Sequence, residues 1–258
     1  MSFYKLTLKY NGHRYQGWQK QPHTELTVQG QLNRALAKIS KSKEVKTLGS
    51  GRTDTGVHAL AQVVRVEIPL VIPPEKLVRA LNSNLPDDIE CLMAENADEN
   101  FHPVFGSVDK TYRYIFALGK RRDPLLNQQI TFMTRKLDIE KMEEACKLFV
   151  GKHDFADFFT VGTDVATTVR EIFSCSLTKM EATGFFHDLC PEYFVFEVTG
   201  SGFLKQMVRL MVATIWNIGE GKIDAASLAE SLRKPDGNKL APVAPPQGLY
   251  LTKVTYNS

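Results

Sequence analysis

The first ten residues alternate between apolar and polar side chains, and this pattern predicts a strand with one buried face. The apolar spacing then changes to that of an amphipathic helix, which begins behind the capping residue Thr27. A pair of prolines opens a second helix, and another proline closes it. The elements expected here are a strand at 4–10, a helix at 28–39, strands at 45–48 and 62–68, a helix at 73–85 and a strand at 89–94. Their order is that of a ferredoxin-like split βαβ unit.

The remainder of the chain repeats this order with additions. The expected elements are a strand at 110–116, a helix at 139–149, a turn at 151–155, strands at 173–177 and 193–198 with an exposed loop between them, a long helix at 203–218, a short helix at 224–232 and a strand at 249–256. No flexible linker separates the halves. We therefore expect an α+β fold with an N-terminal ferredoxin-like (RRM-like) half, 1–103, and a C-terminal one, 104–258. The two halves would share one continuous, mostly antiparallel sheet with helices on one face.

Composition narrows the class of protein without identifying it. The chain has 258 residues, of which 43% are hydrophobic and 24% charged, and this profile is typical of a globular protein with an ample core. The net charge of +3 means that any nucleic-acid surface must be local. The N-terminus has no signal-peptide apolar run, no stretch is long enough to span a membrane, and the cysteines lie in apolar stretches. We expect a cytoplasmic protein.

The most unusual stretch, Gly49 to His58, lies between two predicted strands and contains Arg52 and Asp54. Its glycines permit positive φ and close approach of a ligand to the backbone. Two interpretations are open at this point. The carboxylate can cap backbone N–H groups in a surface turn, or it can be an ionised nucleophile oriented by the arginine.

Several other chemistries fit the sequence poorly. Gly51 to Gly56 have the spacing of a phosphate-binding loop, but Val57 and His58 stand where lysine and serine or threonine are required. Gly200 to Gly202 lack the third glycine of a dinucleotide fingerprint. No C-x-x-C or H-E-x-x-H motif is present. We therefore expect neither a cofactor nor a metal.

The segment Tyr15 to Gln21 interleaves aromatic, amide and basic side chains around Trp18. Such residues can stack on nucleobases and bind their edges, or Trp18 can fix the loop to the core. In the second half, Tyr112 and Tyr114 share one face of a strand, and the pattern does not separate a ligand-binding tyrosine from a core tyrosine. Arg209 lies in an apolar helix, where an unpaired guanidinium is costly, so we expect it to have a salt-bridge partner.

In these motifs the chain resembles the tRNA pseudouridine synthase A family, whose G-R-T-D-x-G-V-H signature stands here as Gly51 to His58. The resemblance extends along nearly the whole chain. Further matching stretches are Tyr10–Gly12, Gly17–Gln19, Asn82–Pro86, Phe101–His102, Lys110–Tyr114, His153–Phe155, Phe203–Arg209 and Gly248–Leu251. Their order and spacing together make the resemblance specific.

The resemblance implies an enzyme that isomerises uridine to pseudouridine at positions 38–40 of the tRNA anticodon stem-loop, without a cofactor. It assigns Asp54 as the catalytic carboxylate, Arg52 as its orienting partner, Tyr112 as the residue that stacks on the flipped-out uracil, and Arg209 as a second partner of Asp54. His58 has no evident chemical task and is given a structural role.

The resemblance also implies a homodimer with a basic cleft for the anticodon arm. The candidates for phosphate contacts are Arg14, Lys20, Lys110, Arg113, Lys120, Arg121 and Arg122. A non-catalytic RNA-binding protein with the same sheet is the alternative, and a small-molecule lyase or hydrolase is a third possibility. An RNA-binding module gains nothing from an arginine-anchored carboxylate, which repels phosphate, and a small-molecule enzyme has no use for the loop around Trp18.

Overall fold

The computed structural model describes residues 1–119, 122–160 and 165–257. These residues form two compact units: unit 1 contains residues 1–108 together with 250–258, and unit 2 contains residues 109–249. The sequence-based division at residue 103 assigned the last strand to the second half. In the structure, the contacts of this strand place it in unit 1. No described helix combines the length and apolarity that crossing a bilayer requires.

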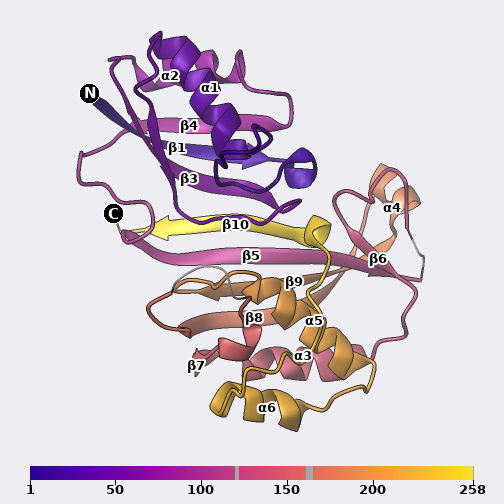
Figure 1. The fold of residues 1–258 in the computed structure, drawn as a ribbon. Helices are drawn as coiled ribbons and strands as arrows, with labels where there is room; N and C mark the ends of the chain where they lie inside the picture. Colours follow the sequence, from indigo (N-terminus) through magenta and orange to yellow (C-terminus); the bar gives the residue numbers. More distant parts are fainter. Residues whose placement is uncertain (120–121, 161–164, 258) are drawn as a thin grey trace. The chain divides into compact units, whose positions relative to one another are not determined.

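Unit 1 has the predicted split βαβ order (Figure 1). β1 lies between β4 and β3, and it is antiparallel to both. The opposite edge of β3 pairs with β2 in an antiparallel manner and with β10 in a parallel manner. The elements are β1 (Ser2–Tyr10), a 3₁₀ turn (Gly12–Arg14), α1 (Val28–Ser40), β2 (Lys46–Gly49), β3 (His58–Ile68), α2 (Pro74–Asn82), β4 (Ile89–Asn96) and β10 (Leu249–Tyr256).

The helices of unit 1 cover one face of its strands, as burial shows. Along β1 the alternate residues Tyr4, Leu6 and Leu8 are buried, and the residues between them are more exposed. Leu32 of α1 and Leu77 of α2 are also fully buried. The period-two and period-3.6 patterns in the sequence therefore meet in one core.

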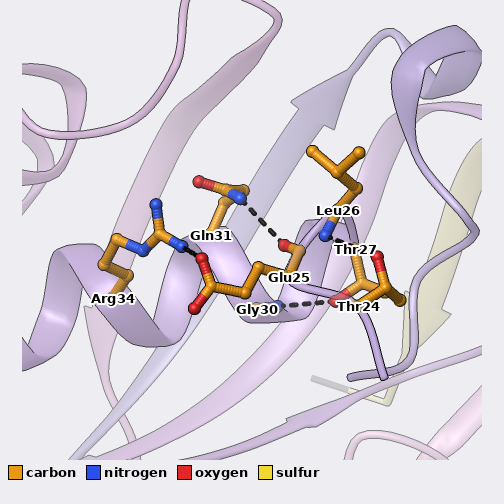
Figure 2. Close-up of polar contacts among 7 residues, drawn as sticks. All are labelled: Thr24, Glu25, Leu26, Thr27, Gly30, Gln31 and Arg34. Carbon is orange, nitrogen blue, oxygen red and sulfur yellow. Dashed lines mark hydrogen bonds and ion pairs between the residues drawn. The ribbon is translucent and has the colours of Figure 1, made fainter. Parts of the chain in front are cut away.

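Side chains from the preceding loop fix the start of α1 (Figure 2). The Thr27 hydroxyl accepts a hydrogen bond from the Gly30 N–H at 3.1 Å, which confirms the predicted cap. The Gln31 amide donates to the Glu25 carbonyl at 2.9 Å, and Arg34 forms an ion pair with the Glu25 carboxylate. The direction in which the chain enters α1 is thereby defined.

In unit 2 the strands follow the order β5-β9-β8-β7, all antiparallel, and β6 lies parallel to β5. The elements are β5 (Ser107–Leu118, from residue 109 onward in this unit), β6 (Thr131–Met133), α3 (Ile139–Leu148), β7 (Gly151–Asp154), a 3₁₀ turn (Ala156–Phe158), β8 (Val169–Glu181), α4 (Phe185–Leu189), β9 (Glu192–Gly200), α5 (Met207–Gly219), α6 (Ala225–Arg233) and a 3₁₀ turn (Pro246–Gly248).

Unit 2 departs from the sequence prediction in three places. Residues 151–154 form strand β7 rather than a turn, because they pair with residues 169–172 of β8. The long helix begins at Met207 instead of residue 203, since Gln206 before it has a left-handed backbone with φ of 63°. The predicted loop between β8 and β9 contains the short helix α4.

Helix α5 forms the centre of the unit 2 core. Nearly all of its residues are buried, and Trp216 packs edge-on against the rings of Tyr114 and Phe116, each at 5.5 Å between centroids. Such aromatic contacts add to the free energy gained by burying apolar area. The predicted α+β class, with mostly antiparallel strands, is confirmed.

Candidate active site

The loop from Ser50 to Val57 connects β2 to β3, and a buried hydrogen-bond network fixes its first residues to β3. The Ser50 N–H donates to the Val63 carbonyl at 2.8 Å, and the Ser50 hydroxyl donates to the Gln62 Oε1 at 2.7 Å. The Gln62 amide in turn donates to the Gly51 carbonyl at 2.7 Å. Ser50 and Gln62 are both fully buried, so these bonds are costly to break.

A second segment, residues 10–18, packs against the same loop from another side. The backbone N–H of Trp18 donates to the Thr53 carbonyl at 3.0 Å, and the Gly56 N–H donates to the Tyr15 carbonyl at 3.2 Å. The hydroxyls of Tyr10 and Thr53 share a hydrogen bond of 2.8 Å. The backbone on both sides of Asp54 is therefore bonded to a separate part of unit 1.

Two glycines make this close approach possible. A Cβ atom on Gly12 would lie 1.9 Å from the Val57 carbonyl oxygen. Gly17 has φ of +89°, and a Cβ there would lie 2.8 Å from the Thr53 carbonyl oxygen. Any side chain at either position would push the two segments apart.

Asp54 itself is half-buried, and its carbonyl accepts a hydrogen bond from the Val57 N–H at 3.1 Å. Arg52 is exposed, and in the part of the chain that the structure describes no ion pair joins it to Asp54. Thr53 between them is buried. The structure thus holds the carboxylate in a fixed loop but does not form the expected Arg52–Asp54 pair.

Trp18 belongs to the core of unit 1. Its side chain is 1% exposed, it stacks on Tyr10 with ring centroids 6.1 Å apart, and it covers Gly49, where a Cβ would lie 2.6 Å from the indole Nε1. Of the two interpretations, the one in which Trp18 fixes the loop to the core agrees with this structure. The residue supports the Asp54 loop and offers no free face for a nucleobase.

His58 has a structural position as well. It is buried, its Nδ1 accepts a hydrogen bond from the Gly12 N–H at 3.0 Å, and its ring stacks on Tyr250 at 4.7 Å. The imidazole thereby joins the end of the Asp54 loop to the segment after β1. The histidine that ends the sequence motif therefore fixes the end of the loop through these two contacts.

The structure distinguishes the two tyrosines on β5, both of which lie in unit 2. Tyr114 is fully buried; its hydroxyl donates to the Pro245 carbonyl at 2.8 Å and shares a hydrogen bond of 2.8 Å with Thr131. Burial raises the pKa of Tyr114 above its usual value. Tyr112 is 7% exposed and packs edge-on against Phe203 at 5.1 Å. Tyr114 is therefore a core residue bonded within unit 2, whereas the buried Tyr112 ring lies against Phe203.

Arg209 lies on α5, also in unit 2, and is half-buried. Its Nε donates to the Ala244 carbonyl at 2.7 Å, and the Ala244 N–H donates to the Arg209 carbonyl at 3.4 Å. The guanidinium thus has a backbone hydrogen-bond partner, while the expected salt bridge to a carboxylate stays a prediction. The bond fixes the arginine side chain against the proline-rich segment that precedes β10.

The candidate phosphate contacts have very different environments. Arg14 is exposed and forms a 3.7 Å ion pair with Asp88, and Lys20 and Arg122 are exposed. Arg113 is half-exposed and pairs at 2.5 Å with Glu197, its neighbour across β5 and β9. Lys110, in contrast, is buried. Lys120 and Arg121 lie outside the described residues.

Sequence reasoning missed several supporting residues. Tyr15 is buried and its hydroxyl donates to the Asp88 carboxylate; burial and this bond raise the pKa of Tyr15. The Tyr15 carbonyl also accepts a hydrogen bond from the Gly56 N–H in the Asp54 loop, so Asp88 helps to hold this loop through Tyr15. Arg170 on β8 was likewise not singled out. Tyr15 lies in the segment around Trp18, but Asp88 and Arg170 lie in no recognised motif, so spacing alone gave no signal for these two. No cluster of potential metal ligands occurs within the described ranges.

Comparison with known proteins identifies the family of this chain. The sequence matches the family described as tRNA pseudouridine synthase over residues 7–106 and 145–257. A tRNA pseudouridine synthase A of Listeria monocytogenes serovar 1/2a is 38% identical over 257 residues, covering 99% of this chain and 100% of that protein. The protein of the same name from Lacticaseibacillus casei is 39% identical over 256 residues, with 99% and 100% covered. The one from Streptococcus pneumoniae is 35% identical over 256 residues, with 99% of each chain covered. This chain belongs to the tRNA pseudouridine synthase family.

Proposed function

We propose that this protein isomerises uridine to pseudouridine in tRNA, with Asp54 as the catalytic carboxylate. The observation that carries the proposal is the position of Asp54: it is half-buried in a loop that two separate segments of unit 1 hold by backbone hydrogen bonds. A preorganised carboxylate needs no reorganisation during the reaction. The full-length family match supplies the reaction and the substrate class.

The reaction conserves atoms and electrons, so a carboxylate can catalyse it without a redox partner. The N1–C1′ bond of the uridine breaks, the uracil rotates, and a C5–C1′ bond forms; the C5 hydrogen leaves as a proton, and N1 gains one. Asp54 can attack C1′ or remove a ribose proton to begin this sequence. The target base must leave the helical stack to reach the loop.

Other residues receive roles as part of the same proposal. Tyr112 would stack on the uracil, and its hydroxyl would take part in removing the C5 proton. Arg52 is exposed beside Asp54 and would bind a phosphate or the carboxylate once RNA is present. Arg209 would stabilise the charge of Asp54. Arg14, Lys20 and Arg113 would bind the backbone of the anticodon arm.

Release of tritium from the uracil C5 tests the reaction directly. Unmodified tRNA transcript labelled at C5 should lose tritium with the wild-type protein, since the new carbon–carbon bond replaces that hydrogen. Asp54→Asn and Asp54→Ala should abolish release. Asp98→Asn, an exposed aspartate in a turn of unit 1, is the matched control and should release tritium normally. Wild-type protein that binds tRNA without releasing tritium would favour the non-catalytic RNA-binding alternative.

The resemblance to the family extends the proposal to the target and the assembly. We propose uridines 38–40 of the anticodon arm as targets, a homodimer as the active form, and the cytoplasm, where tRNA is processed in bacteria, as the location. Mapping of pseudouridine in a treated transcript and sedimentation of the purified protein test the first two. Modification confined to another arm, or a monomer with full activity, would contradict them.

A further inference from the structure

Strand β5 carries a lysine on its buried face. Lys110 is 7% exposed, and it forms no hydrogen bond or ion pair with another residue among those that the structure describes. A buried ammonium group without a partner is costly, so such a side chain is rare in a purely structural role. Lys110 lies two residues before Tyr112 on the same face of the strand.

The strand register places a second cation near this lysine. Lys110 is opposite Gly200 of β9, and Gly200 is opposite Ile172 of β8, so the three residues form one row across the sheet. Arg170 lies two residues before Ile172, and its Nε would be 3.9 Å from a Cβ on Gly202. Gly200, which lies between Lys110 and Ile172 in this row, carries no side chain.

Arg170 also has no acidic partner within the described ranges. One of its nitrogens, Nη1, donates to the carbonyls of Thr167 and Val169 at 2.8 and 2.6 Å, and these bonds hold the guanidinium in place. The neighbouring Glu171 is exposed on the opposite face of β8. Two cations therefore share a partly desolvated region of unit 2, and no carboxylate among the described residues forms an ion pair with either of them.

The electrostatics agree with this description. Burial, and next the nearby charge of Arg170, lower the pKa of Lys110 to about 8. Burial also lowers the pKa of Arg170. An anion bound between the two groups would reverse both effects, because an opposite charge favours the protonated form.

We propose that Lys110 and Arg170 form an anion subsite that binds a phosphodiester group of the RNA, next to the nucleotide that Tyr112 receives. This assignment rests on the proposed function for the identity of the RNA. Two residues along a strand span about 7 Å, which matches the distance between a base and a neighbouring backbone phosphate. Phe203 links the two positions, since it contacts Tyr112 and would lie 3.4 Å from a Cβ on Gly200. Arginine and lysine are the usual ligands of phosphate oxygens.

Binding of a labelled anticodon stem-loop RNA, measured by fluorescence anisotropy, tests the subsite without relying on catalysis. Wild-type affinity should fall about tenfold between pH 7 and pH 9, because Lys110 loses its proton near pH 8 and must regain it to bind phosphate. Lys110→Arg stays charged and should bind with little pH dependence. Lys110→Met should bind more weakly at pH 7, with a salt dependence lower by about one phosphate contact. Lys179→Met, on the exposed side of β8 and paired with Glu192 at 2.6 Å, should match wild type.

A neutral linkage in the RNA gives the complementary test. Methylphosphonate at a linkage flanking the target uridine removes the charge from the ligand, so it should weaken binding to wild type and leave binding to Lys110→Met unchanged. If Lys110→Met had the affinity, salt slope and pH profile of the wild type, the subsite proposal would be wrong. It would also be wrong if a methylphosphonate at each flanking linkage weakened RNA binding equally in both proteins. Should Lys110→Met fail to fold, the loss of pH dependence in Lys110→Arg decides alone. Tritium release is measured separately. If the expected binding results are obtained but no tritium is released, the proposed function is wrong and the subsite proposal is still supported.

Discussion

Replacing Gly12 with alanine tests whether the segment after β1 positions the catalytic loop. The new Cβ would lie 1.9 Å from the Val57 carbonyl oxygen and 2.6 Å from the carbonyl carbon, whereas Cβ atoms in proteins essentially never approach other heavy atoms within 3.0 Å. The gap to the oxygen must therefore widen by at least 3.0 − 1.9 = 1.1 Å. Both contacting groups are backbone, so no side-chain rotation can relieve the clash.

The displacement should reach the reaction centre. Val57 donates its N–H to the Asp54 carbonyl, and Gly12 donates its N–H to His58, so the loop cannot move at one end alone. A shift of about 1 Å in a reacting group costs on the order of 10²-fold in rate. We expect kcat for tritium release to fall about hundredfold, while overpacking lowers the free energy of unfolding by ~1–3 kcal/mol. The protein should remain folded, because typical domains have 5–15 kcal/mol of stability.

Steady-state tritium release and thermal melting separate these two effects. Gly221→Ala is the matched control: it also has positive φ, at +70°, but its Cβ would meet no atom within 4 Å. Strain at that position should lower the melting temperature and leave kcat unchanged. Wild-type kcat in Gly12→Ala would refute the reasoning, and so would an equal loss of activity in the two variants.

Four further substitutions give three independent tests. Tyr114→Phe loses two hydrogen bonds and should lower the free energy of unfolding by ~1–2 kcal/mol with tritium release retained, whereas Tyr112→Phe should reduce tritium release. Trp18→Ala should cost ~3–5 kcal/mol of stability in denaturant titrations, and the RNA affinity of the folded protein should not change. Arg113→Ala should reduce the slope of log Kd against log salt by about 1, and an unchanged slope would exclude it from the phosphate contacts.

Local patterns predicted most of the fold because they reflect local physics. The last strand was predicted from alternation at residues 249–256 and is observed as Leu249–Tyr256. The cap at Thr27 was recognised from residue type alone. Strand β7 was missed because its four residues, Gly151–Asp154, are too few to show alternation and gain their strand structure from pairing with β8. The late start of α5 depends on the left-handed backbone of Gln206, a conformation that its residue type does not signal.

The candidate site was only partly predictable from the sequence. The motif around Asp54 indicated the carboxylate, but the residues that hold its loop come from β1, β3 and the segment between β1 and α1. The two alternatives for Trp18 and the ambiguity between Tyr112 and Tyr114 had the same cause. Strand periodicity gives the face on which a side chain lies, and it does not give what covers that face.

Lys110 shows why charge in a sequence is a poor guide to where a nucleic acid binds. In the sequence it resembles Arg113 three residues later: both are basic, and both belong to one motif. In the structure Arg113 has a carboxylate partner and solvent, whereas Lys110 has neither. An exposed cation that already has a carboxylate partner contributes little to stability, since water and its partner already satisfy it. The cation that the fold leaves buried and unpaired gains most when a phosphate arrives, and among the basic residues of β5 that is Lys110.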